Sequence, residues 1–359
     1  MISFFMLAYP QLWEKPHFSV EHIRDLQRES KRDPILLERT LYAFGLLEAL
    51  SRVGLPFIFK GGTSLMLLLE HPMRLSTDID IVVAPDEDID HFIREAGKIF
   101  PFASCEEQIR HGHNDIEKRH FKFQYDSPIN QRPFYILLDV VFEENHYARL
   151  VEKPIRNELL LLDDGAEDQL VRMPDANCMI GDKLTAFAPH TTGISFGIQK
   201  EMEIIKQMYD ISTLLEVMDD FSLVRETYLD VVETEIRYRG IDVTAQDCLQ
   251  DTLDTALCIL SRGKIHREDY PLLQDGIRRI IGHIFRENFN GELAIGRAAK
   301  VFLLAANLLS GQGTFHGISE STDYAHATLN GTPYKVLNYL KRQDTEAFKT
   351  VYEGARLIV

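Results

Sequence analysis

The feature that most constrains this chain is a short unit in which a Gly-Gly turn is followed, one helix later, by an Asp-x-Asp strand. The first part reads Phe57-Ile-Phe-Lys-Gly-Gly-Thr-Ser-Leu65, and the second reads Arg74-Leu-Ser-Thr-Asp-Ile-Asp-Ile-Val-Val83. Glycine lets the backbone approach a ligand because no Cβ intervenes, and paired carboxylates can hold a divalent cation. The unit therefore combines a group that can bind phosphate with a group that can bind metal.

The Gly-Gly turn lies between an apolar strand end, residues 57–59, and a helix that we expect to begin at Thr63 or Ser64. Free N–H groups at a helix start point toward whatever lies in front of them, and the helix dipole adds partial positive charge. The pattern predicts that Gly61, Gly62, Thr63 and Ser64 cradle a phosphate. A Gly-Gly pair taken alone is more often a plain tight turn, which is the alternative.

The acidic pair Asp78 and Asp80 lies two residues apart in an expected strand, so both carboxylates should project from one face. Adjacent carboxylates repel each other, which raises their pKa values unless a cation intervenes. Mg²⁺ binds through a few carboxylates together with substrate phosphates. A solvated strand face or a strand cap is the alternative, and the phosphate-type turn upstream favours the metal.

A third acidic residue, Asp139, interrupts the apolar strand Tyr135-Ile-Leu-Leu-Asp-Val-Val-Phe142. A carboxylate among apolar neighbours is costly unless it lies at a strand end, is hydrogen-bonded or binds a metal. We therefore take Asp139 as the third candidate metal ligand, with a purely structural role as the alternative. Glu143 and Glu144, just past the strand, are weaker candidates.

The amino-acid composition of the chain is typical of a globular protein. The chain has 359 residues, of which 45% are hydrophobic and 26% charged, which predicts two domains or one large elaborated domain. The sequence changes character after about residue 160, so we expect an α/β domain over residues 1–172 and a mainly helical domain over 173–359. No apolar run approaches the roughly 20 residues of a membrane span, and residues 1–10 lack the basic start of a signal peptide. These features predict a cytoplasmic protein with no membrane partner.

Cysteine content and net charge exclude further classes. The four cysteines are scattered without a Cys-x-x-Cys pair, which argues against a disulfide framework and a zinc knot. The formal net charge is −16, whereas proteins that hold nucleic acid by neutralising phosphates usually present a basic surface. Tight nonspecific binding to DNA or RNA is disfavoured, although one positive site could still dock an RNA end transiently.

Periodicity gives a coarse set of elements. Residues 20–53 and 89–99 predict helices, and the alternation over residues 120–125 predicts a strand. Asp175 is a plausible N-cap for a helix that begins a long helical region. Further helices are expected at about 222–238, 244–262, 268–286, 293–310, 333–341 and 345–357.

The combination of turn and acidic strand resembles the nucleotidyltransferase superfamily. More narrowly, Lys60-Gly-Gly-Thr-Ser-Leu followed by Arg74-x-Ser-x-Asp-x-Asp is similar to the AbiEii/AbiGii toxin family, the nucleotidyltransferase-like toxins of bacterial abortive-infection and type IV toxin–antitoxin systems. The resemblance implies an α+β fold, with a nucleotidyltransferase-fold domain built on a small mixed β-sheet and a helical C-terminal domain. It also implies that an acidic residue on a neighbouring strand, here Asp139, completes the metal site.

Two later motifs extend the resemblance. Gly181-Asp-Lys-Leu-Thr-Ala-Phe187 resembles the family's Lys-Leu-x-Ala motif, and Lys206-Gln-Met-Tyr-Asp-Ile-Ser212 resembles its Arg/Lys-Asp-x-x-Asp-Leu motif, with Gln207 departing from the usual acidic residue. By resemblance, Lys183 offers positive charge to a triphosphate, and Asp210 orients an incoming hydroxyl or acts as its general base. The alternatives are a solvated helix lysine and an Asp210 that pairs with Lys206.

The function that the resemblance implies is metal-dependent transfer of NMP from an NTP to an acceptor, by a toxin paired with a cognate antitoxin. One or two Mg²⁺ ions would bind Asp78, Asp80 and Asp139, and the acceptor would be an RNA end such as the 3′ end of tRNA. Arg74 either contacts the nucleotide or holds the loop against the acidic face. The alternatives are a catalytically silent nucleotide-binding regulatory module, and nucleotidylation of a small molecule or a protein.

Other chemistries fit the sequence less well. The run His111-Gly-His113-Asn-Asp115 is similar to the His-x-His-x-Asp of metallo-β-lactamase hydrolases, but Ile116 stands where that motif needs histidine, so we expect a polar loop. In haloacid-dehalogenase phosphatases an apolar strand precedes the Asp-x-Asp, which the polar residues before Asp78 do not provide. A metal-dependent sugar transferase would leave the Gly-Gly helix unexplained.

Overall fold

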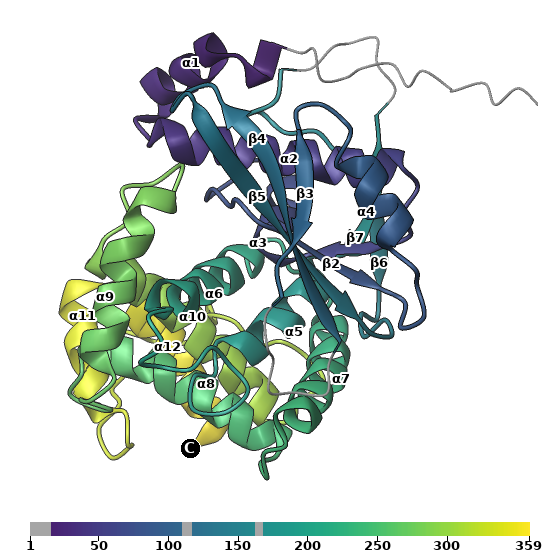
Figure 1. The fold of residues 1–359 in the computed structure, drawn as a ribbon. Coiled ribbons are helices and arrows are strands. Elements are labelled where there is room, and N and C mark those ends of the chain that lie inside the picture. Colours follow the sequence, from purple (N-terminus) through teal and green to yellow (C-terminus); the bar gives the residue numbers. More distant parts are fainter. Residues whose placement is uncertain (1–15, 110–116, 162–167) are drawn as a thin grey trace, which may run out of the picture. The chain divides into compact units, whose positions relative to one another are not determined.

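The computed structural model describes residues 16–109, 117–161 and 168–359 (Figure 1). These form two compact units. The first holds residues 16–109, 117–144, 152–161 and 168–173, and the second holds residues 145–151 and 174–359. The predictions for residues 1–10 and for the loop at 111–115 lie outside the described residues.

The first unit is built on a five-stranded mixed sheet with the order β1-β2-β5-β4-β3. Strands β2 and β5 run parallel, and the other neighbouring pairs are antiparallel. The predicted small mixed sheet is confirmed. Its strands are β1 Ile58–Lys60, β2 Ile79–Val83, β3 Ser104–Glu107, β4 Lys118–Ser127 and β5 Arg132–Phe142; β6 Leu150–Pro154 and β7 Leu170–Pro174 form a separate two-stranded sheet.

One face of the five-stranded sheet is apolar and packs on helices. Alternate residues of β4 and β5 are buried, as the alternation over 120–125 predicts. Tyr125 of this face stacks on Tyr42 of α2 Pro34–Arg52, with ring centroids 3.9 Å apart. Glu38, also on α2, is fully buried and accepts hydrogen bonds from the Tyr125 hydroxyl and the Ser127 hydroxyl, both at 3.0 Å. These bonds fix α2 against the sheet.

The helical prediction for residues 20–53 is confirmed, except that the chain breaks at residues 31–33 between α1 Val20–Ser30 and α2. Lys31 adopts a left-handed conformation with φ 55°, and Asp33 caps α2 by accepting from two backbone N–H groups. Pro34 occupies the first turn, where its missing N–H costs nothing and where it cannot continue a preceding helix. The apolar residues that read as one stripe in the sequence therefore belong to two helices.

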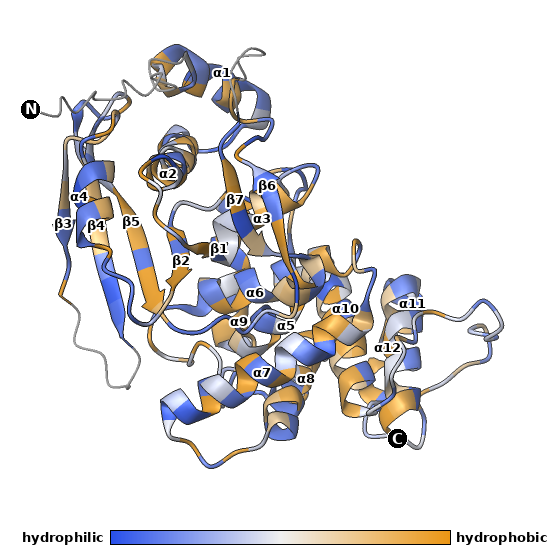
Figure 2. Cartoon of the chain, turned by 90° about the vertical axis from the view of Figure 1, so that its right-hand side faces the viewer, coloured by the Kyte–Doolittle hydropathy of each residue, from blue (hydrophilic) through white to orange (hydrophobic). Residues whose placement is uncertain are grey.

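The short 3-10 helix η1 Pro16–Phe18 precedes α1. Helix α3 Gly61–Leu68 follows β1 and leads toward β2, and α4 Asp90–Ala96 follows β2. Helix α4 is shorter at both ends than the predicted 89–99. Strand β5 is mostly hydrophobic in Figure 2, as a strand in the middle of a sheet should be.

The second unit is helical, and the predicted helical character of the C-terminal region is confirmed. Asp175 caps α5 by accepting from the Cys178 N–H at 2.8 Å, as predicted. Helix α10 packs against α6, α8 and α12 and supplies much of the core. The helices are α5 Ala176–Ala186, α6 Glu201–Leu214, α7 Phe221–Arg239, α8 Ala245–Leu260, α9 Tyr270–Ile280, α10 Gly291–Leu309, α11 Leu340–Gln343 and α12 Thr345–Ile358, with short 3-10 turns η2 Ile281–His283 and η3 Lys335–Tyr339.

Helix α7 in Figure 2 alternates between hydrophilic and hydrophobic segments, which is typical of a helix that buries one side. Within the described part of the chain, none of the helices combines the length and apolar composition needed to cross a membrane.

Candidate active site

Four polar residues form a row across the less buried face of the five-stranded sheet. Lys60 on β1 pairs in register with Asp80 on β2, Asp80 with Asp139 on β5, and Asp139 with His120 on β4. Cross-strand partners project to the same side, so their side chains share one face. The neighbours that project to the other face are fully buried apolar residues: Ile79, Ile81, Leu138 and Val140. We call Lys60, Asp80, Asp139 and His120 the polar row.

Asp80 lies directly against the Gly-Gly turn. A Cβ built on Gly61 would come within 2.0 Å of Asp80 Oδ2, and Gly61 has a φ of +80°, which side chains rarely adopt. Glycine is therefore required at this position for two reasons, the backbone conformation and the close carboxylate. The sequence predicted a phosphate-binding turn and an acidic strand, and the structure brings one residue of each into contact.

Arg74 packs on the second glycine of the turn. A Cβ on Gly62 would meet Arg74 Nη2 at 2.5 Å, and the guanidinium is buried, with Nη1 donating to the Leu75 carbonyl at 3.2 Å. This position agrees with a role in holding the loop against the acidic face. It also keeps a fixed positive charge beside the turn.

Helix α3 begins at Gly61, two residues earlier than the first of the predicted starts, Thr63 and Ser64. Lys60 is the N-cap residue and makes no side-chain cap hydrogen bond. The Thr63 hydroxyl donates to the Asp78 carbonyl at 2.6 Å, and the Ser64 hydroxyl donates to the Gly61 carbonyl at 2.8 Å. Both hydroxyls are buried, so these side chains brace the turn, and any phosphate contact there falls to backbone N–H groups.

Asp78 directly precedes β2, and its side chain is more exposed than that of Asp139. Its Oδ1 lies 3.3 Å from Nη2 of Arg39, which comes from α2. The Arg39 guanidinium also lies over the Phe134 ring, 5.6 Å from the centroid. Arg39 could not be recognised from the sequence, because a single arginine in an apolar helical stripe belongs to no motif.

Asp139 is held by a histidine that is not among the site residues predicted from the sequence. His120 Nδ1 lies 2.6 Å from Asp139 Oδ1. A signal for this contact exists in the sequence, because the hairpin turns between Ser127 and Arg132 and the register then pairs His120 with Asp139. The alternation over 120–125 predicted the strand but not its partner.

Carboxylate oxygens are the donors that Mg²⁺ prefers, and Asp80 and Asp139 are register partners on neighbouring strands. The donor set therefore suits a hard divalent cation. Within the described ranges, however, no group of three or more His, Cys, Asp or Glu side chains is arranged to hold a metal. Mg²⁺ commonly binds through one or two carboxylates plus substrate phosphates, so a nucleotide would have to supply the remaining oxygens.

In the second unit, Lys183 on α5 and Asp210 on α6 form a buried ion pair. Lys183 Nζ lies 2.8 Å from Asp210 Oδ2, and the side chains are only 6% and 1% exposed. The alternative of a solvated Lys183 is wrong. Gln207 Oε1 is 3.5 Å from the same Nζ, so the residue that departs from the family motif lies beside the lysine. Lys206 pairs with Glu203 at 2.9 Å.

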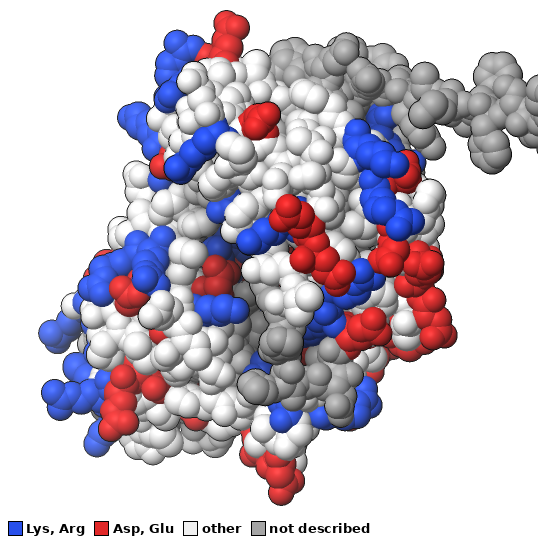
Figure 3. All heavy atoms as spheres, viewed as in Figure 1, with Lys and Arg blue, Asp and Glu red and all other residues white. Residues whose placement is uncertain are grey.

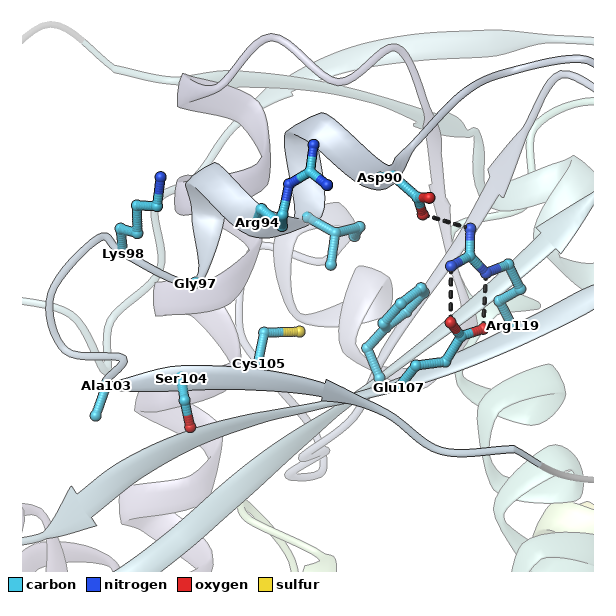
Figure 4. A pocket seen from close by; sticks show the side chains of 11 residues that line it. Asp90, Arg94, Gly97, Lys98, Ala103, Ser104, Cys105, Glu107 and Arg119 are labelled. Carbon is cyan, nitrogen blue, oxygen red and sulfur yellow. Dashed lines mark hydrogen bonds and ion pairs between the residues drawn. The ribbon is translucent and has the colours of Figure 1, made fainter.

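A cavity of about 400 Å³ lies on the other face of the sheet, between α4 and the β3–β4 edge (Figure 4). Arg119 donates to both Glu107 oxygens, at 2.7 and 2.8 Å, and to Asp90 at 2.8 Å. This pairing lowers the pKa of Glu107, while burial raises the pKa of the Cys105 thiol to about 12. A thiol with that pKa stays protonated and unreactive at neutral pH. The residues that line this cavity include none of the predicted site residues.

The family model of the nucleotidyl transferase AbiEii toxin, type IV toxin–antitoxin system, matches residues 45–291. The chain belongs to this family. The matched range includes the Gly-Gly turn, the polar row and the Lys183–Asp210 pair, whereas Arg39 precedes it. Family membership makes the protein a nucleotidyltransferase with a mixed α/β fold.

None of the curated proteins matches the sequence. Two solved structures are similar. JHP933 from Helicobacter pylori is 12% identical, with 76% of this chain and 93% of that chain covered and a TM-score of 0.42. An antigenic nucleotidyltransferase-like protein from Paracoccidioides brasiliensis is 17% identical, with 56% and 89% covered and a TM-score of 0.36.

Proposed function

We propose that this nucleotidyltransferase transfers NMP from an NTP to a hydroxyl at an RNA end, such as the 3′ end of tRNA. The observation that carries the proposal is the contact between Asp80 and Gly61, because it joins a carboxylate of the polar row to the start of a helix. A phosphate bound at the start of α3 would then lie next to a cation bound by Asp80.

The turn and its basic neighbours would bind the nucleotide. Backbone N–H groups at the start of α3 point toward the helix N-terminus and favour anions. Buried Arg74 beside Gly62, and Lys60 at the end of the polar row, add positive charge. These groups orient a triphosphate without contributing a proton to the reaction.

Asp80 and Asp139, with Asp78, would hold one or two Mg²⁺ ions together with phosphate oxygens. When bound, Mg²⁺ supplies Lewis-acid stabilisation of charge on the phosphate and on the attacking and leaving oxygens. By holding the cation, the carboxylates would fix the position of the triphosphate that shares it. Asp80 is the residue on which the chemistry depends most, because it also touches the turn.

Lys183 would present its ammonium group to the triphosphate and offset charge on the leaving pyrophosphate. The family resemblance implies that Asp210 orients the acceptor hydroxyl or acts as its base. Its 1% exposure and its bond to Lys183 favour a different role, in which Asp210 holds the ammonium group in position. Gln207 beside the same ammonium adds a neutral acceptor.

An RNA acceptor must bind a protein whose charges are mixed. Figure 3 shows acidic and basic residues interspersed on the face displayed, and the chain carries a net charge of −16. This composition supports transient docking of an RNA end over extended binding along a strand. Because the family is that of a toxin–antitoxin system, we include a cognate antitoxin as the proposed protein partner.

The test is to offer each of the four [α-³²P]NTPs in turn, with Mg²⁺ and total cellular RNA. We expect labelled RNA with the wild type and with Asp86→Asn, a matched change in the exposed loop after β2, and no labelled RNA with Asp80→Asn. Label on a protein or a small molecule in place of RNA would overturn the RNA acceptor. No label under any NTP, with growth inhibition retained by Asp80→Asn, would favour a silent nucleotide-binding module.

A further inference from the structure

We propose that His120 is a positioning residue for the nucleotidyl transfer reaction, and that its Nδ1–H holds the Asp139 carboxylate in the orientation needed to bind a divalent cation and NTP. This inference rests on the proposed function of the polar row. It assigns a role to a residue outside the Gly-Gly, Asp-x-Asp and lysine motifs.

The contact is short and comes from a rigid part of the sheet. The Nδ1 to Oδ1 distance is 2.6 Å, just below the roughly 2.7–2.9 Å usual between a charged nitrogen donor and a carboxylate oxygen. His120 and Asp139 are register partners in the antiparallel β4–β5 pair, which is continuous from the pair Lys118 and Val141 to the pair Ser127 and Arg132. The backbone therefore fixes the separation of the two side chains.

The direction of the bond follows from the chemistry of the two groups. An ionised carboxylate only accepts hydrogen bonds, so the hydrogen must lie on Nδ1. Both the neutral Nδ1–H tautomer and the imidazolium donate from this atom, and the role therefore does not depend on the charge of His120. Because Oδ1 is engaged by His120, Oδ2 is the oxygen that can turn toward a cation.

Each carboxylate of the candidate site is oriented by a different contact. Asp80 packs on the Gly61 backbone, and Asp78 lies 3.3 Å from Arg39. Asp139 lies between the apolar residues Leu138 and Val140 of β5, and His120 supplies its polar partner. Removal of a residue that orients a metal-binding carboxylate typically lowers the metal affinity by about 10–100-fold.

The test is calorimetric titration of Mn²⁺ into the full-length protein with a non-hydrolysable NTP analogue. We expect His120→Ala to weaken Mn²⁺ binding by about tenfold or more. His120→Asn should recover most of the affinity, because its amide nitrogen occupies nearly the position of Nδ1. Lys122→Gln, two residues along β4 on the same face, should bind Mn²⁺ like the wild type. In the transfer reaction, His120→Ala should lower kcat and leave the KM for the acceptor unchanged.

Wild-type Mn²⁺ affinity in a folded His120→Ala protein would overturn the inference. So would a folded His120→Asn protein that binds no better than His120→Ala. If Asp80→Asn and Asp139→Ala lose both Mn²⁺ binding and transfer while His120→Ala keeps them, only the role of His120 fails. If Asp80→Asn and Asp139→Ala keep wild-type binding and transfer, the proposed function fails and the role of His120 fails with it.

Discussion

The His120–Asp139 pair of the sheet and the Lys183–Asp210 pair of the helical unit have nearly the same length but different surroundings. The two distances are 2.6 and 2.8 Å, yet the side chains are 15% and 30% exposed in the first pair and 6% and 1% exposed in the second. The first pair leaves a carboxylate oxygen within reach of a ligand. In the second pair the carboxylate is only 1% exposed, so Asp210 can fix the position of the ammonium group but has little access to an acceptor.

The largest expected effect is on stability, from breaking the buried pair. Asp210→Ala leaves the Lys183 ammonium buried without its carboxylate, and such a change typically costs about 3–5 kcal/mol of unfolding free energy. Asp139→Ala removes the more exposed pair and should cost no more than about 1 kcal/mol. Urea denaturation of the two variants measures the difference.

A double variant separates charge burial from packing. Lys183→Met with Asp210→Leu removes both charges, and the unfolding free energy should return to within about 1–2 kcal/mol of the wild type. The protein should then be folded but poor at nucleotidyl transfer. Equal destabilisation by Asp210→Ala and Asp139→Ala would contradict the contrast between the pairs.

The second effect concerns the turn that contacts the polar row. Gly61→Ala places a Cβ against Asp80 and forces alanine into a φ of +80°, so we expect a loss of about 1–3 kcal/mol in stability from backbone strain and a loss of transfer activity. Gly54→Ala is the matched control, because Gly54 has a φ of +78° with nothing within 4 Å of its Cβ position. Denaturation and label transfer should be measured on both.

Both alanine variants should lose stability through φ, but only Gly61→Ala should lose transfer activity. Comparable activity in the two variants would show that the close approach of Gly61 to Asp80 has no part in the chemistry.

The smallest effect is expected on the opposite face of the sheet. Arg119→Gln breaks an exposed ion-pair network and should cost at most about 1 kcal/mol, with transfer activity unchanged. Arg119 lowers the folded-state pKa of Glu107. The stabilisation that the pair gives the folded protein is therefore fully present above the ordinary glutamate pKa of about 4.3, and it is lost as the pH falls through the lowered pKa of Glu107. Urea denaturation at neutral and at acid pH should show that the difference in unfolding free energy between wild type and variant becomes smaller at acid pH.

The sequence predicts local features of this molecule well where a few neighbouring residues determine them. The helical C-terminal region and the Asp175 N-cap follow from helical periodicity and capping chemistry, whereas the small mixed sheet is what the resemblance to the nucleotidyltransferase superfamily implies. The residues Asp33-Pro34 are a signal for the break between α1 and α2. Because the apolar stripe continues across them, the periodicity nevertheless predicts helix throughout residues 20–53.

Contacts between distant segments could not be predicted in the same way. His120 meets Asp139 only because the hairpin fixes the register, and Arg39 meets Asp78 only because α2 packs on the sheet. The partner of Lys183 depends on how α5 and α6 pack, which the helical periodicity of either segment does not contain. Motifs thus identify the residues of the candidate site, and the fold identifies the residues that hold them.

The most direct measurement is the location of a bound paramagnetic cation. In backbone amide NMR spectra of the deuterated protein with Mn²⁺ and a non-hydrolysable NTP analogue, we predict that the resonances of Gly61, Asp80 and Asp139 broaden first and that this broadening is lost in Asp80→Asn. Unchanged resonances for these residues, with broadening centred on the Arg119 network or on other acidic residues, would contradict the assignment of the polar row as the catalytic site.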